Sequence, residues 1–132
     1  MSHFAWYPGA RAALESAFGN ALNKTAEDIV LDVEARGVVP YAESAKKRGH
    51  EAGRLAKSVA VQPVKASAKG ARIVWNVSYA ARAYFHPDWQ FSTVVHGNAR
   101  GRWMDDYIDG ERTAFVRERY NRHLGILGVL FR

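Results

Sequence analysis

The chain has 132 residues, of which 48% are hydrophobic and 12% aromatic. This length and composition predict one folded domain, residues 1–132, with a real core, and exclude a disordered tail. The formal net charge is +6, and the absence of cysteine excludes disulfide scaffolds, thiolate zinc sites and cysteine nucleophiles.

The N-terminal segment lacks the basic start and the continuous apolar run of a signal peptide. No apolar stretch approaches the roughly 20 residues that a bilayer-spanning helix needs. We therefore expect synthesis in the cytoplasm and no membrane partner.

Residues 10–36 predict one long helix, or two helices joined near Asn23, where Thr25 and Asp28 offer a capping box. Gly37 and Pro40 are expected to end the helix, since glycine accepts the left-handed cap and proline cannot continue it. The apolar positions at helical spacing are Leu14, Phe18, Leu22, Ile29 and Val33. The outer face is expected to be acidic, with Glu15, Glu27, Asp28, Asp32 and Glu34.

Residues 45–73 hold the entire basic excess of the chain. Eight basic residues and one acidic residue give this segment a net charge of +7, while the rest of the chain has 11 basic and 12 acidic residues. A localised positive patch attracts polyanions more strongly than diluted charge does, which favours a nucleic-acid partner. The alternative is that these side chains serve only solubility. The basic residues are Lys46, Lys47, Arg48, Arg54, Lys57, Lys65, Lys69 and Arg72.

Within this region, residues 41–57 are small, polar and basic and predict an exposed loop or weak helical turn. Alternating apolar residues at 59–64 and 72–78 predict a β-hairpin. Pro63 lacks an amide hydrogen and therefore suggests an edge strand or a bulge. Lys65, Lys69 and Arg72 are expected at the hairpin tip, where long side chains reach outward.

Residues 79–85 predict a short helix ended by His86 and Pro87, residues 91–95 a possible strand, and residues 97–101 a loop. Residues 103–124 predict a helical stretch interrupted at Gly110. The apolar tail, 125–132, is expected to complete a sheet or dock into another subunit. The fold class is therefore α+β, with a long N-terminal helix and a C-terminal helix packed on a small antiparallel sheet containing the hairpin.

No constellation of residues indicates an enzyme, a cofactor or a metal site. Asp105 and Asp106 are adjacent, and neighbouring helical residues point about 100° apart, so a solvated acidic turn facing arginines is favoured over cation binding. His86 and His96 flank Asp88, and a small metal-dependent nuclease using these three is the lowest-ranked alternative. No nucleophile elbow or phosphate-binding glycine loop is present.

Several aromatic residues stand near basic ones, as on a platform that stacks single-stranded bases. Core packing explains them better, because Trp75 alternates with Ile73 and Val77 on one strand face. The aromatic residues concerned are Trp75, Tyr79, Tyr84, Phe85, Trp89 and Phe91.

The order of short motifs along the chain indicates a protein family more specifically than any single residue does. A helix closed by VVP at 38–40 is followed by GRLAKS at 53–58, a strand, WNVSYA at 75–80, Tyr84 and Trp103. This order resembles the minor capsid, or neck and tail-completion, proteins of long-tailed bacteriophages. The twelve residues between Pro40 and Gly53 are more than that family usually has, which suggests a variable element that lines a channel or grips the next ring.

The resemblance implies a non-enzymatic, ring-forming component of the virion neck that surrounds the DNA path, with neighbouring connector and tail proteins as partners. The residues expected to face the DNA channel are Lys46, Lys47, Arg48, Lys65, Lys69 and Arg72. The acidic helix face and the tail residues Leu127, Val129, Leu130 and Phe131 are expected to contact other subunits. The alternative is a free nucleic-acid-binding module that uses residues 46–72.

Overall fold

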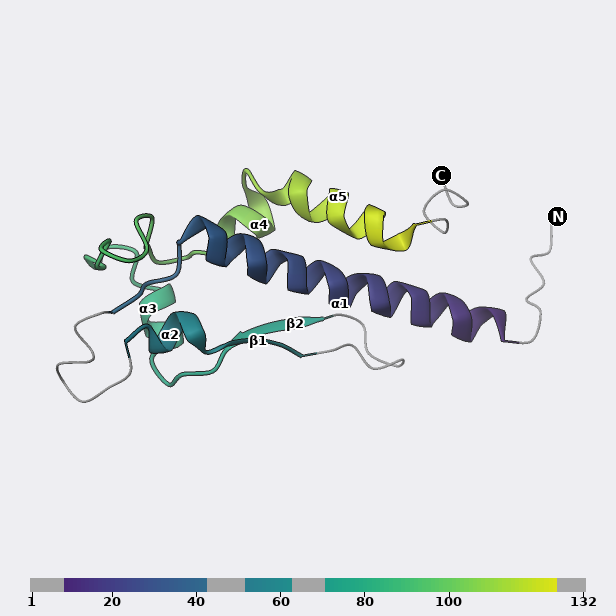
Figure 1. Ribbon diagram of the computed structural model, residues 1–132, viewed down its shortest axis with the longest axis horizontal. Helices are drawn as coiled ribbons and strands as arrows, with labels where there is room; N and C mark the ends of the chain where they lie inside the picture. Colours follow the sequence, from purple (N-terminus) through teal and green to yellow (C-terminus); the bar gives the residue numbers. More distant parts are fainter. Residues whose placement is uncertain (1–8, 43–51, 63–70, 126–132) are drawn as a thin grey trace.

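The computed structural model describes residues 9–42, 52–62 and 71–125 (Figure 1). A long helix, α1, lies between two other layers. A β-hairpin covers one side of α1, and the last two helices cover the other. The predicted α+β class is confirmed. The elements are α1 (Ala10–Arg36), α2 (Arg54–Lys57), β1 (Val59–Gln62), β2 (Arg72–Trp75), α3 (Ala80–Tyr84), α4 (Asp105–Asp109) and α5 (Thr113–Leu124).

Helix α1 is a single unbroken helix of 27 residues, about 40 Å long at 1.5 Å per residue. The capping box considered near Asn23 does not form. Instead, the buried hydroxyl of Thr25 donates to the carbonyl of Ala21 at 2.7 Å, within the helix. The predicted C-terminal cap is confirmed, because Gly37 has φ 59° and its N–H donates to the carbonyl of Glu34. Packing on both sides explains why so long a helix needs no break.

The predicted hairpin is confirmed, although its second strand ends at Trp75 and not at residue 78. β1 and β2 are antiparallel, with Val59 opposite Trp75 and Val61 opposite Ile73. These four side chains therefore share one face of the hairpin, as the alternation in the sequence required. Val59 and Trp75 line a hollow with Val30 and Val33 of α1, so that this face is the one turned to the helix.

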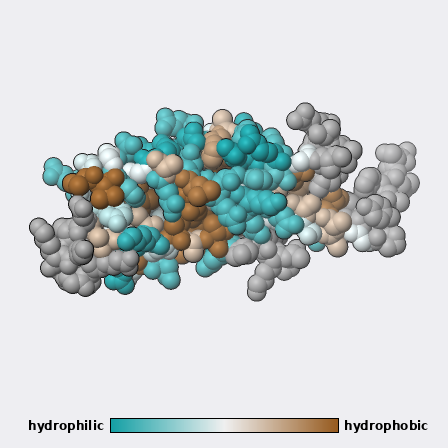
Figure 2. All heavy atoms as spheres, viewed as in Figure 1, coloured by the Kyte–Doolittle hydropathy of each residue, from teal (hydrophilic) through white to brown (hydrophobic). Residues whose placement is uncertain are grey.

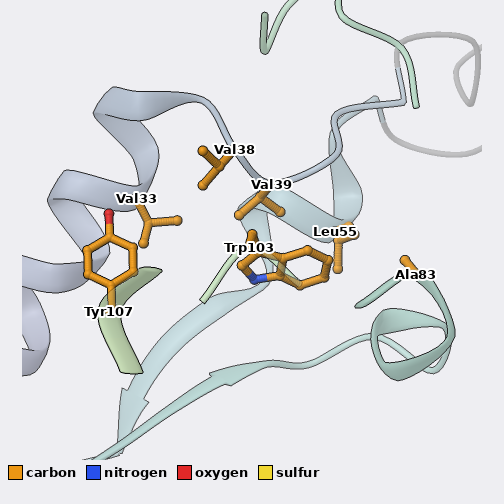
Figure 3. Close-up of a cluster of buried hydrophobic side chains, with 7 residues drawn as sticks. All are labelled: Val33, Val38, Val39, Leu55, Ala83, Trp103 and Tyr107. Carbon is orange, nitrogen blue, oxygen red and sulfur yellow. The ribbon is translucent and has the colours of Figure 1, made fainter. Parts of the chain in front are cut away.

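The core gathers side chains that are far apart in the sequence (Figure 3). Trp103 is 1% exposed and meets Trp75 and Tyr84 edge to face, with ring centroids 5.6 and 4.9 Å away. Leu55 of α2 and Ala83 of α3 close the same cluster. The prediction that Trp75 packs in the core is therefore confirmed. The buried members are Val33, Val38, Val39, Leu55, Ala83, Trp103 and Tyr107.

One sequence prediction was wrong, and another was right only in part. Residues 91–95 form no strand, since neither β1 nor β2 pairs with them and only Phe91 packs against the core. The prediction for 41–57, an exposed loop or weak helical turn, is right in that its described residues include the four-residue helix α2. It is wrong about exposure, because Leu55 is 4% exposed, and one large apolar residue was too weak a sequence pattern to indicate a buried side.

The predicted short helix at 79–85 and the interrupted helical stretch are confirmed as α3, and as α4 and α5. The long connection between α3 and α4 is anchored to the end of α1. The N–H of Arg100 donates to the carbonyl of Val38 at 3.0 Å, and a ring nitrogen of His96 lies 2.7 Å from the carbonyl of Val39. The side-chain amide of Asn98 donates to the carbonyl of Arg36. This connection is therefore held in place although it contains no regular structure.

Candidate nucleic-acid and subunit interfaces

Most residues predicted to contact DNA or other subunits lie outside the described residues. Lys46, Lys47 and Arg48 fall in 43–51, Lys65 and Lys69 in 63–70, and the tail residues Leu127, Val129, Leu130 and Phe131 in 126–132. The turn predicted between the strands and the edge role of Pro63 lie outside as well.

Three cations of the basic segment are described, and all three are exposed. Arg54 and Lys57 lie on α2, and Arg72 begins β2, opposite Gln62. The two undescribed basic stretches join the fold at opposite ends of this unit, one before α2 and the other at the far ends of β1 and β2 (Figure 1). The described part of the segment thus presents its positive charge to solvent along the hairpin unit.

The two ends of stretch 43–51 are joined by contacts around Gly53. The N–H of Gly53 donates to the carbonyl of Ala42 at 3.4 Å. Gly53 has φ 70°, and a Cβ there would lie 2.1 Å from the ring of Tyr41. The ammonium of Lys57 lies 5.9 Å from the centroid of that ring. The glycine of the GRLAKS motif is therefore required twice, for its left-handed backbone and for the ring seated against it.

The other positions of the motifs also have definite structural roles. Leu55 fills the core, and the hydroxyl of Ser58 donates to the carbonyl of Leu55 at 2.7 Å, where α2 ends. Trp75 and Ala80 of the WNVSYA motif pack against the core, whereas Tyr79 is 40% exposed. Most of the residues that carry the resemblance therefore meet in one cluster.

The acidic face predicted for α1 is partly wrong, because two of its carboxylates are turned inward to α4 and α5. Asp32 accepts hydrogen bonds from Arg112, at 2.7 and 3.0 Å, and from the hydroxyl of Tyr107 at 2.6 Å. Asp28 pairs with His123 at 2.6 Å. Glu27 and Glu34 are exposed. The sequence pattern missed these pairs because the partners lie 75 to 95 residues further along the chain.

Asp105 and Asp106 face cations and a phenol, as the arginine-facing interpretation predicted. Asp106 accepts a hydrogen bond from Arg36 at 3.0 Å and also pairs with Arg100. Asp105 accepts from Tyr84 at 2.6 Å and from Arg102 at 2.7 Å. The described residues bring no three metal-ligating side chains together. The hydrogen bond to Asp105 and, above all, burial raise the pKa of Tyr84 to about 12.

The hydrogen bond from Arg36, together with Arg100, lowers the pKa of Asp106. Because the folded-state pKa lies below the unfolded value, this carboxylate stabilises the fold above the unfolded pKa, and the contribution is lost as the pH falls through the folded pKa. We expect Asp106→Asn to reduce the pH dependence of the free energy of unfolding below about pH 5. Urea denaturation from pH 2 to 7 measures this, with exposed Asp88→Asn as the control. An unchanged slope would contradict the coupling.

The two histidines of the nuclease alternative do not converge. His86 stacks on Trp89 with ring centroids 4.3 Å apart, and its ring nitrogen lies 2.6 Å from the carbonyl of Arg82. His96 packs near Tyr41, with ring centroids 5.1 Å apart, at the end of α1. Each ring is engaged in local packing, in a different part of the fold.

Large apolar side chains are exposed where sequence reasoning expected a strand or core packing. Figure 2 shows apolar areas at two places on one face, over the middle of the molecule and near the end where the connection between α3 and α4 lies. In that connection Phe85, Trp89, Val94 and Val95 are 62, 43, 77 and 45% exposed. The aromatic residues near basic ones therefore divide into core members, such as Trp75 and Tyr84, and surface members, Phe85 and Trp89.

Comparisons of the chain with protein-family models, with curated proteins and with solved structures give no match. Among the described residues, no helix is both long enough and apolar enough to cross a membrane. The fold and the distribution of charge must therefore support any functional proposal.

Proposed function

We propose that this chain is a non-enzymatic structural virion protein that forms a ring at the neck between the head and tail of a long-tailed bacteriophage. The basic segment 46–72 would face the DNA channel, and neighbouring connector and tail proteins would bind the outside of the ring. Contacts to DNA would be made through phosphates, which suits a passage through which any sequence must slide.

The observation that carries this proposal is where the positive charge of the chain is concentrated. Several acidic residues of α1 and α4 are paired with cations that lie beside them in the fold, as in Asp32 with Arg112 and Asp106 with Arg36 and Arg100. The segment 45–73 has one acidic residue and eight basic ones, and its described cations Arg54, Lys57 and Arg72 are exposed to solvent. The net positive field of the protein therefore originates in residues 45–73.

The way the motifs pack adds support from a second direction. Leu55, Trp75 and Trp103 of the phage-like motifs meet in one core. Motif residues that lie far apart in the chain therefore belong to one packing arrangement. The motif glycine, Gly53, follows the stretch that contains Lys46, Lys47 and Arg48, and it donates a hydrogen bond to Ala42, which precedes that stretch.

The experiment replaces Lys46, Lys47 and Arg48 with glutamine in the full-length chain and in particles that contain it. We expect the free energy of unfolding of the isolated chain to change by no more than about 0.5 kcal/mol, because surface substitutions away from packed features have small effects. We expect assembled particles to lose packaged DNA, measured as the ratio of DNA to protein in purified particles.

A matched control removes three positive charges elsewhere, by replacing the exposed residues Lys24, Arg82 and Arg117 with glutamine. This variant is expected to retain DNA as wild type does. Equal loss of DNA in both variants would contradict a channel role for the basic segment. Absence of the chain from particles, together with DNA binding that weakens steeply with salt, would favour the free nucleic-acid-binding module instead.

A further inference from the structure

Four large apolar side chains are exposed on one short stretch of the chain. We call them the 85–95 surface; its members are Phe85, Trp89, Val94 and Val95. Elsewhere, exposed large apolar residues such as Leu31 on α1 and Ile108 on α4 lie on helices. A cluster of this kind on a small charged domain marks a binding surface more often than chance exposure does.

The aromatic members of the 85–95 surface are held by the core beneath them. Phe85 packs edge to face on Tyr84 with ring centroids 5.0 Å apart, and Tyr84 packs on the buried Trp103. Trp89 stacks on His86 at an interplanar angle of 19°. Rings that are fixed before binding lose little conformational entropy in a complex, which is typical of the residues that dominate interface affinity.

An arginine completes this surface. The guanidinium of Arg102 lies 5.8 Å from the ring centroid of Phe85, and the Arg102 side chain is 50% exposed. The guanidinium is oriented by its hydrogen bond to Asp105 at 2.7 Å, and the backbone N–H of Arg102 donates to the carbonyl of Tyr84. Aromatic residues and arginine are enriched together at the centres of protein interfaces, which favours a protein partner over a nucleic acid here.

Residues 126–132 have the apolar character needed to bind the 85–95 surface. Residues 126–132, ILGVLFR, contain five large apolar residues and one charge. Seven residues reach at most about 25 Å when fully extended. This segment is long enough to cover four apolar side chains and apolar enough to bury them.

The direction of α5 argues that the acceptor surface belongs to a second copy and not to the same chain. His123, near the end of α5, pairs with Asp28 in α1, whereas Asp106, before α5, pairs with Arg36. α5 therefore runs away from the end of α1 at which His96 contacts Val39 and the 85–95 surface lies (Figure 1). The C-terminal end of α5, at Leu124, therefore lies away from the 85–95 surface of the same chain.

We infer that residues 126–131 of one copy of this chain dock on the 85–95 surface of a second copy. Each copy then has one donor segment and one acceptor surface, and contacts of this head-to-tail kind close into rings when the rotation between copies permits. Closure into a ring rests on the proposed function, whereas the contact between two copies does not.

The test uses two variants of the full chain, Trp89→Ser in the acceptor surface and Val129→Asp in the donor segment. We expect wild type to associate in sedimentation velocity over a concentration series up to about 1 mM, and each variant to associate at least about tenfold more weakly. An equimolar mixture of the two is expected to form a 1:1 dimer, because each variant keeps the half that the other lacks. Ile108→Ser, which removes a 72% exposed apolar side chain from α4, is the matched control and should associate like wild type.

Circular dichroism checks that each variant is folded, and Val94→Ser replaces Trp89→Ser if the latter unfolds. A wild-type chain that stays monomeric, a Val129→Asp variant that associates like wild type, or a mixture that forms no dimer would each overturn the inference. If the chain forms these dimers but is absent from phage particles, the proposed function is contradicted and the docking is not. If the chain is found in the neck but its copies touch through other surfaces, the docking is contradicted and the proposed function is not.

Discussion

Trp103→Ala is expected to lower the free energy of unfolding by about 3 to 5 kcal/mol. Trp103 is 1% exposed, and its indole contacts the rings of Trp75 and Tyr84, which come from β2 and α3. Removing it leaves a cavity where the hairpin, α3 and the segment before α4 meet, and among the described residues no other tryptophan is fully buried (Figure 3). Urea denaturation followed by far-ultraviolet circular dichroism measures the loss.

Trp89→Ala removes the same side chain from the surface and is the matched control. Trp89 is 43% exposed and stacks on His86 alone at close range. We expect it to cost no more than about 1 kcal/mol, because nearly half of its surface is still exposed to water in the folded monomer. If both variants lost the same stability, Trp103 would not be the centre of the core.

The local elements were predictable because each has a strong pattern of its own. Period-two alternation around Val61 and Ile73 indicated the strands, and Gly37 marked the end of α1, as the register and the left-handed cap confirm. The strand predicted at 91–95 was wrong for a physical reason. Its residues have strand propensity, but a strand also needs a hydrogen-bonding neighbour, and the fold places none of the described strands beside them.

The candidate interfaces were less predictable, because they depend on which side chains the fold pairs or buries and which it leaves exposed. Nothing in the sequence near Asp32 shows that Arg112 and Tyr107 will neutralise and bury it. Likewise Phe85 and Trp89 read as core aromatics in the sequence, yet their neighbours Tyr84 and Phe91 take the places against the core. Long-range pairing decides both outcomes, and a single sequence does not encode it locally.

Gly53→Ala is expected to lower the free energy of unfolding by about 2 to 4 kcal/mol, from two separable causes. The backbone at Gly53 has φ 70°, which costs a residue with a side chain about 1 to 2 kcal/mol. In addition, the new Cβ would lie 2.1 Å from the ring of Tyr41, so the ring or the backbone must shift. Gly97→Ala is the control with no expected effect beyond about 0.5 kcal/mol, since nothing lies within 4 Å of a Cβ there.

A double-mutant cycle with Tyr41→Ala separates the two causes. In that background the ring is gone, and Gly53→Ala should cost only the backbone part, about 1 to 2 kcal/mol. An equal cost in both backgrounds would show that the ring does not rest on the glycine. Gly53 and Ala42 are hydrogen-bonded on either side of the stretch that contains Lys46, Lys47 and Arg48. If the proposed function holds, Gly53→Ala particles should lose DNA although all the basic residues are still present. That result would show that the position of the positive charge matters as well as its amount.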